Sequence, residues 1–154
     1  MNEQRDIESR KNNIMIYGIE EQIRGTEEKE QEQDKKEIKE ILYIIGAQDI
    51  IPTHHRIGKK DENGLKQRPI KMILKSASEK EKIMQNLHKL KPYGNWLGLS
   101  IRDDLTINAR KRIKEKCQEA KNLNKGNNCD FVWRVRGSPR TRLHKKLGSQ
   151  LKES

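Results

Sequence analysis

Pro69-Ile-Lys-Met-Ile-Leu-Lys75 is the stretch that decides the fold, because apolar residues recur there at every second position. Successive side chains of a strand point to opposite faces, so Ile70, Met72 and Leu74 share one face and are expected to meet a core. The other face carries Lys71, Ile73 and Lys75. The stretch is therefore predicted to be a strand that is buried on one side.

Three further segments precede this strand. Residues 13–19 are a short β-branched run and are predicted to form a strand. A helix is predicted between Gly25-Thr26 and Gly46, since apolar residues recur at the spacing of one helical face. That stripe consists of Ile38, Ile41, Leu42 and Ile45. Residues 50–58 are predicted to be an edge strand, because Pro52 has no N–H for a central ladder.

A second helix and a fourth strand follow. Ser76 and Glu79 have the spacing of a capping box that opens a helix. The apolar stripe of this helix is Ile83, Met84, Leu87 and Leu90. The fourth strand is marked by alternating apolar residues at Leu97, Leu99 and Ile101. The order β-α-β-β-α-β predicts an α+β domain over residues 12–104, with the split βαβ plan of ferredoxin-like folds.

Residues 105–147 are predicted to form a small basic α-β-β domain. Thr106 is a suitable N-cap for its helix, and Gly126 is a suitable stop. One face of the helix is apolar, with Ala109, Ile113, Cys117, Ala120 and Leu123. The opposite face is basic, with Arg110, Lys111, Arg112, Lys114 and Lys116. Residues 131–137 alternate as a strand, and residues 141–145 are expected to form a second strand.

The charge of the chain is unevenly distributed. Residues 1–50 hold 8 Lys or Arg against 13 Asp or Glu, and residues 51–154 hold 26 against 10, so the net charges are −5 and +16. An excess of this size favours a polyanionic partner, above all a nucleic acid, over a cationic surface without a partner. An anionic membrane is a weaker alternative, because no helix combines a Lys/Arg face with a Trp/Phe/Leu face.

The strongest candidate binding residues lie in the basic domain, where eight cations occur in a short span with few acidic residues. Arg134 and Arg136 share a strand face with Val132, where only a polyanion or solvent suits them. The candidate nucleic-acid-binding residues of the basic domain are Arg110, Lys111, Arg112, Lys114, Arg134, Arg136, Arg140 and Arg142. Those of the first domain are Lys71, Lys75, Arg56, Lys59 and Lys60.

Stacking of bases on the sheet is expected to be poor. The RNA-recognition motif carries its stacking aromatic residues on the first and third strands. Here the third strand has none, and the first has only Tyr17, near its end, with Met15 at the centre. Trp133 is expected to be a core residue rather than a stacking platform. Binding through phosphates, without sequence preference, is therefore predicted.

No catalytic, metal or cofactor site is expected. Asp103-Asp104 has no third ligand at a useful spacing and is predicted to belong to a turn before a helix. His54-His55 would point to opposite faces of a strand, so the pair would not chelate one metal ion. Cys117 and Cys129 are isolated thiols, which favours a reducing, intracellular environment. The chain also lacks a phosphate-binding P-loop motif and a nucleophile-elbow motif.

Four stretches, in this order, resemble the first-open-reading-frame proteins of LINE-class non-LTR retrotransposons, particularly the insect type that often occurs with endonuclease–reverse transcriptase sequences. They are residues 10–20 (RKNNIMIYGIE), 55–60 (HRIGKK), 68–75 (RPIKMILK) and 99–106 (LSIRDDLT). The resemblance spans roughly residues 10–145. It implies an RNA-recognition-motif-like domain and a C-terminal domain that together bind the element's RNA.

Members of that family coat their RNA as a ribonucleoprotein and act as nucleic-acid chaperones during target-primed reverse transcription. The basic pair that opens the first helix of the family's C-terminal domain corresponds to Arg110 and Lys111. The family also forms trimers through an N-terminal coiled coil. Residues 1–11 would be a stub of it, without sustained heptads, and residues 148–154 a disordered tail, so the chain is expected to be partial.

Two alternatives remain open at this point. The acidic helix around Glu27–Glu40 could dock on the basic region of another copy, which would make the chain an assembly module. The chain could also be a non-catalytic fragment of an endonuclease–reverse transcriptase product. In the favoured interpretation it is an intracellular ribonucleoprotein component, in the cytoplasm or the nucleus, that binds RNA or single-stranded DNA.

Overall fold

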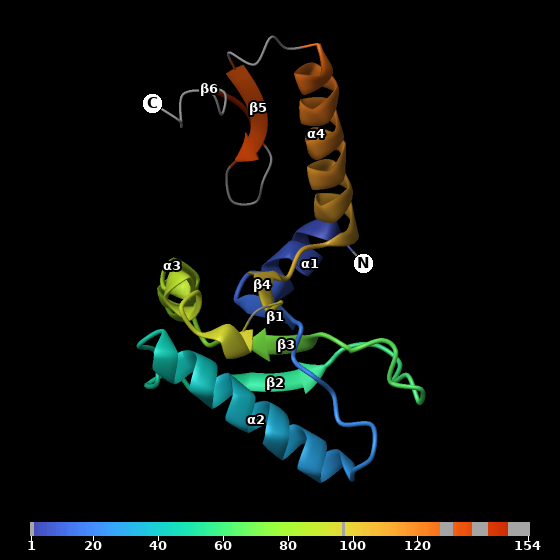
Figure 1. The fold of residues 1–154 in the computed structure, drawn as a ribbon, viewed down its shortest axis with the longest axis vertical. Coiled ribbons are helices and arrows are strands. Elements are labelled where there is room, and N and C mark those ends of the chain that lie inside the picture. Colours follow the sequence, from blue (N-terminus) through green and yellow to red (C-terminus); the bar gives the residue numbers. More distant parts are fainter. Residues whose placement is uncertain (1, 97, 127–130, 137–141, 148–154) are drawn as a thin grey trace. The chain divides into compact units, whose positions relative to one another are not determined.

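The computed structural model describes residues 2–96, 98–126, 131–136 and 142–147. The chain has an α+β fold and divides into two compact units, residues 1–104 and residues 105–154 (Figure 1). Each unit has its own sheet.

A four-stranded sheet forms the centre of the first unit. Its strands are β1 (Asn13–Tyr17), β2 (Thr53–Arg56), β3 (Ile70–Ile73) and β4 (Ser100–Asp103). The spatial order is β2-β3-β1-β4, and every neighbouring pair is antiparallel. The helices of this unit are α1 (Glu3–Arg10), α2 (Glu27–Ile44) and α3 (Ala77–Gln85), with 3-10 turns η1 (Leu87–Leu90) and η2 (Gly94–Trp96). The prediction of an edge strand is confirmed, but the strand is shorter than the predicted residues 50–58 and begins only after Pro52.

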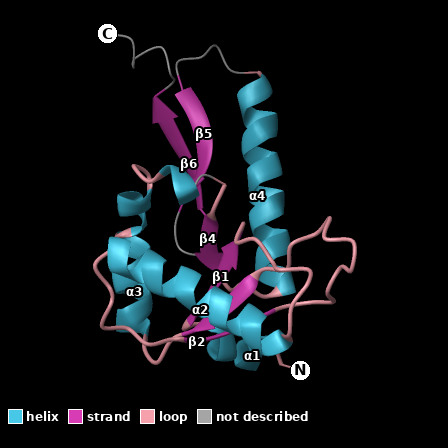
Figure 2. Cartoon of the chain, turned by 60° about the horizontal axis from the view of Figure 1, so that its bottom comes forward, coloured by secondary structure: helices cyan, strands magenta, loops and turns pink. Residues whose placement is uncertain are grey.

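The core lies on one face of this sheet. In the strand register Ile14 is opposite Met72, and Ile16 is opposite both Ile70 and Ile101. Helices α2 and α3 add their apolar stripes to the same cluster, and Figure 2 shows them as the main helical cover of the first unit. Burial alternates along β3 as predicted: its Ile and Met positions at 70 and 72 are buried, and Leu74 just beyond it is buried too.

The N-caps follow the sequence signals. The hydroxyl groups of Thr26, Ser76 and Thr106 each accept a hydrogen bond from the backbone N–H three residues later. Glu79 completes the cap of α3 differently from a standard capping box, because its carboxylate accepts from the N–H of Lys75 at 3.0 Å rather than from that of Ser76.

Two predicted boundaries were wrong. The helix expected to run to Leu90 ends at Gln85 and continues as the 3-10 turn η1. Asn86 stands at the break, where its side-chain amide donates to the carbonyl oxygen of Lys82 at 2.6 Å and competes with the helical pattern. The fourth strand begins at Ser100, because Gly98 has a φ of 89°, which a strand cannot accommodate. Leu97, which was assigned to that strand, lies outside the described residues.

The second unit consists of α4 (Ile107–Lys125) and a hairpin of β5 (Phe131–Arg136) and β6 (Arg142–Leu147). Asn124 joins the helix to the hairpin through both ends of its side-chain amide. It donates to the carbonyl oxygen of Trp133 at 3.0 Å and accepts from the N–H of the same residue at 2.7 Å. Ala120 is buried on this side of α4, whereas Leu123, which was expected there, is exposed.

Candidate nucleic-acid interface

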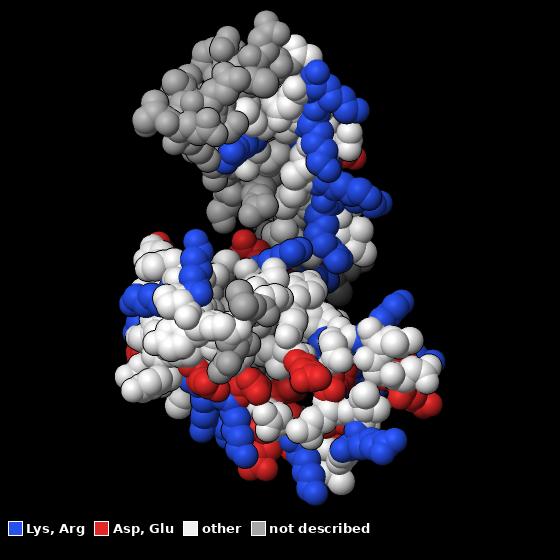
Figure 3. Space-filling view, in the orientation of Figure 1, with Lys and Arg blue, Asp and Glu red and all other residues white. Residues whose placement is uncertain are grey.

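The positive charge of the chain belongs almost entirely to the second unit. Residues 105–154 hold 14 Lys or Arg against 4 Asp or Glu, a net charge of +10. Residues 1–104 hold 20 against 19, a net charge of +1. Lys and Arg side chains succeed one another along α4 in the space-filling view (Figure 3).

The cations of α4 stand on its exposed face. Arg110, Lys111, Arg112 and Lys114 are all exposed, and they are the first charged residues of the helix. The first turn of α4 holds no acidic residue, whereas that of α2 holds Glu27, Glu28 and Glu30. Because a helix N-terminus carries partial positive charge, a cation as near to it as Arg110 is electrostatically unfavourable, and an anion bound there would be stabilised.

The hairpin adds a further candidate on β5. Arg134 is exposed and is the register partner of His144, and Val132 is half-buried. Arg136 and Arg142 are register partners at the end of the hairpin. Arg140 lies outside the described residues.

The two lysines of the first sheet differ in their surroundings. Lys75 is exposed just beyond β3. Lys71 lies on the face opposite the core, but its Nζ is 3.4 Å from Oδ2 of Asp104. Part of its charge is therefore balanced within the protein.

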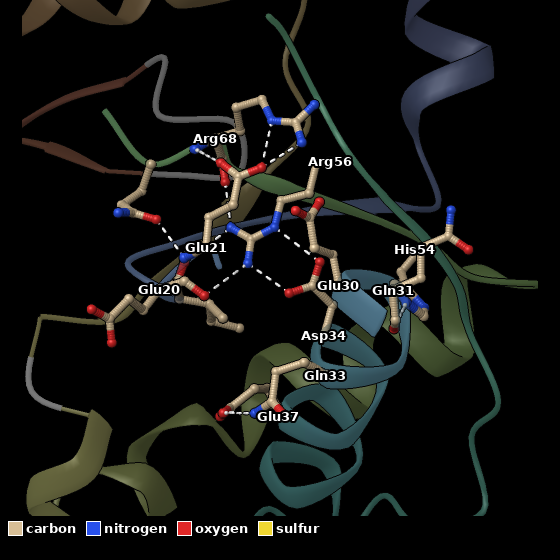
Figure 4. Close-up of polar contacts among 12 residues, drawn as sticks. Glu20, Glu21, Glu30, Gln31, Gln33, Asp34, Glu37, His54, Arg56 and Arg68 are labelled. Carbon is tan, nitrogen blue, oxygen red and sulfur yellow. Dashed lines mark hydrogen bonds and ion pairs between the residues drawn. The ribbon is translucent and has the colours of Figure 1, made fainter. Parts of the chain in front are cut away.

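The side chain of Arg56 is buried and is bonded to other parts of the first unit. Its five N–H donors all have acceptors: two bonds go to the carboxylate of Asp34, at 2.6 and 2.9 Å, and three go to backbone carbonyl oxygens (Figure 4). Those carbonyls belong to Ile19, Glu20 and Arg68. The side chains of Arg56 and Asp34 are each 7% exposed. This guanidinium group has no donor left for a phosphate, so we remove Arg56 from the candidate interface.

The neighbours of Arg56 are also paired. Lys60 forms an ion pair with Glu30, and Arg68 forms one with Glu21. Burial alone would raise the pKa of Glu21, but the bonds from Arg68 outweigh it, and the pKa of Glu21 is lowered. Lys59 is exposed, and no ion pair of it is found in the part of the chain that the structure describes.

Asp104 forms a second buried charge cluster at the end of β4. Its carboxylate accepts from Nη1 of Arg10 at 2.9 Å and from Nδ2 of Asn13 at 3.1 Å, and Lys71 approaches it. Burial would raise the pKa of Asp104, but the bonds from Asn13 and Arg10 and the nearby positive charges lower it. Asp103 pairs with Lys80 at 2.8 Å. The acidic pair thus holds α1, β3 and α3 to β4, a role that sequence reasoning missed.

The face of the sheet opposite the core carries one cation–π contact. The guanidinium of Arg102 lies 5.5 Å from the ring centre of Tyr17, which is 38% exposed. Arg102 was not among the sequence candidates, because only the pairing of β4 with β1 brings the two side chains together.

The residues considered for catalysis or metal binding are dispersed. Nε2 of His54 lies 3.3 Å from the carbonyl oxygen of Gln31, while His55, on the other face of β2, is exposed. Cys117 is half-buried, and Cys129 lies outside the described residues. Among residues 2–96, 98–126, 131–136 and 142–147, His, Cys, Asp and Glu form no group of three that could hold a metal ion.

No described helix combines the length and the apolar character needed to cross a membrane. No family model matches the chain, and a comparison with curated proteins finds no significant match.

The buried pair gives a stability prediction. Arg56→Met leaves Asp34 charged and without its partner in a buried site, so the free energy of unfolding of the first unit should fall by about 3–5 kcal/mol. Denaturant titration of the full chain measures this loss. Lys59→Met, three residues away and exposed, should change it by less than about 0.5 kcal/mol. Equal effects of the two variants would contradict the structural role of Arg56.

Asp104 gives a pH prediction. A carboxyl group whose folded pKa is lowered stabilises the fold above its unfolded pKa of about 3.9, and this contribution disappears as pH falls through the folded value. Asp104→Asn should therefore cost roughly 1–3 kcal/mol at neutral pH. The gap between the two unfolding curves should close below about pH 4. Exposed Glu62→Gln is the control, and a gap that persists unchanged at low pH would refute the assignment.

Proposed function

We propose that this chain is a sequence-tolerant binding protein for single-stranded nucleic acid, RNA or DNA, from a non-LTR retrotransposon. In this proposal it packages the element's RNA as an intracellular ribonucleoprotein and acts as a nucleic-acid chaperone in reverse transcription, with no catalytic step of its own. The observation that carries the proposal is the exposed run of cations on α4, in a unit whose net charge is +10.

The arrangement of the first unit supports an RNA-recognition-motif-like topology within this proposal. Its elements follow the order β-α-β-β-α-β from β1 to β4, and its strands have the spatial order β2-β3-β1-β4. Both orders support the plan of the split βαβ fold. On the face opposite the core, β3 offers Lys71 and Ile73 and no aromatic ring, which favours contacts to phosphate over base readout on the sheet.

Sequence tolerance follows from the chemistry of the contacts. Contacts to phosphate set the position and the strength of binding but carry no base information. The proposed contact residues are Arg110, Lys111, Arg112, Lys114, Arg134, Arg136, Arg140 and Arg142 of the second unit, with Lys59, Lys71 and Lys75 of the first. Lys60 is a weaker candidate because Glu30 already neutralises it.

The proposal is tested by the salt dependence of binding. Replacing Arg110 and Lys111 by Ala removes two proposed phosphate contacts, so the slope of log K against log salt for a single strand should decrease in magnitude by about 1.4. Fluorescence anisotropy with oligouridylate and with oligodeoxyadenylate measures both slope and affinity, and the loss should be the same for both strands.

The matched control is Lys35→Ala/Lys36→Ala, which removes two adjacent exposed cations from α2. It should leave the slope unchanged. Binding that does not respond to salt, or that responds equally to both double variants, would overturn the proposed interface.

A further inference from the structure

The first unit has a surface pocket of about 330 Å³ beside β4. Its lining combines apolar walls, two aromatic rings and one cation: Leu87, Leu90, Leu99, Tyr93, Trp96 and Lys91. All of these residues come from the segment that leads from the end of α3 to the start of β4. The pocket is therefore built by the stretch where the predicted helix and strand boundaries were wrong.

Aromatic residues are scarce in this chain, which makes their gathering here informative. The sequence holds 2 Trp, 3 Tyr and 1 Phe, and two of these six line this one pocket. Trp96 is half-buried against the core cluster. Tyr93 is 50% exposed, so hydrophobic burial does not account for its position at the pocket.

Hydrogen bonds fix the backbone that carries these two rings. Three successive turn hydrogen bonds join Tyr93 to Leu90, Trp96 to Tyr93 and Leu99 to Trp96, at 3.0, 3.1 and 3.1 Å. Little backbone freedom would therefore be lost when a ligand binds.

A close backbone contact ties this segment to the end of β1. A Cβ at Gly18 would lie 2.5 Å from the carbonyl oxygen of Gly98, so only glycine fits there. The segment that forms the pocket thus packs against the residue after β1, one of the two central strands, through a contact that leaves no room for a side chain.

The lining suits a ligand with a planar ring and a negatively charged group beside that ring. The volume is at the lower end of ordinary ligand pockets, and its apolar walls offer no set of polar ligands for a metal ion. Lys91 is exposed, and the ion pairs found among the described residues do not include it. Ring-stacking surfaces beside an unbalanced cation suit a nucleobase and its phosphate.

We propose that this pocket holds one base of a bound single strand between Tyr93 and Trp96, with Lys91 at the adjoining phosphate. The inference rests on the proposed function and extends it, because it gives the first unit a base-stacking site away from the sheet face. Since every base has a stacking face, such a site would strengthen binding without selecting a sequence.

Trp96 itself provides the readout. In full-length Trp133→Phe, Trp96 is the only tryptophan, so its fluorescence reports on the pocket. Titration with oligouridylate should quench this fluorescence to saturation. An abasic strand of the same length has the same phosphates and no bases, so it should bind with little quenching.

Variants separate stacking from charge. In the same background, Tyr93→Ala should weaken oligouridylate binding about tenfold, and Tyr93→Phe should restore it. Tyr43→Ala, which removes an exposed ring from α2, is the matched control and should have no effect. Lys91→Ala should lower the magnitude of the salt slope by about 0.7.

The outcomes distinguish the two proposals. Equal quenching by the abasic strand, or equal affinity of the Tyr93→Ala and Tyr43→Ala variants, would overturn the stacking site. If binding then remained salt-dependent and sensitive to Arg110 and Lys111, the proposed function would stand without it. Failure of both strands to bind would overturn both.

Discussion

The guanidinium of Arg56 is the interaction on which the first unit depends. It comes from the edge strand β2, and its bonds reach α2 through Asp34, the segment after β1 through Ile19 and Glu20, and the approach to β3 through Arg68. Such a buried charge is tolerated only because all five donors are satisfied. One side chain thereby fixes the edge of the sheet, where backbone pairing alone leaves one side open.

The ion pairs of the first unit explain why its net charge does not show which of its cations could bind a ligand. Its 20 cations and 19 anions are close to balance, and several of them, including those at Arg56, Arg68 and Asp104, are bound to each other across elements. Charges that are paired in this way stabilise the fold and are not available to bind a ligand. The second unit has 14 cations and only 4 acidic residues, so its acidic residues can balance only a minority of its cations. Under the proposed function, the cations that stabilise the first unit would therefore differ from most of those that bind the nucleic acid.

Sequence reasoning succeeded where the signal is local. The alternation around Ile70 and the hydroxyl caps at Thr26 and Thr106 depend on neighbours within a few positions. It failed for Arg56, whose partners are 12–37 positions away, and for Asp104, whose partners are 33–94 positions away. The same limit applies to the pocket, since a helix that breaks early and a glycine with positive φ create it together, and neither signal indicates a cavity by itself.

The buried carboxylate of Asp104 has a mechanical consequence. Asp104 is the last residue of the first unit, and only Leu105 and the cap residue Thr106 separate it from α4. Any tension applied to the second unit would reach the first unit along this short link. It would arrive at a side chain clamped by Arg10 and Asn13. The force would therefore act on the contacts of Asp104 with α1 and β1 as well as on the backbone hydrogen bonds of β4.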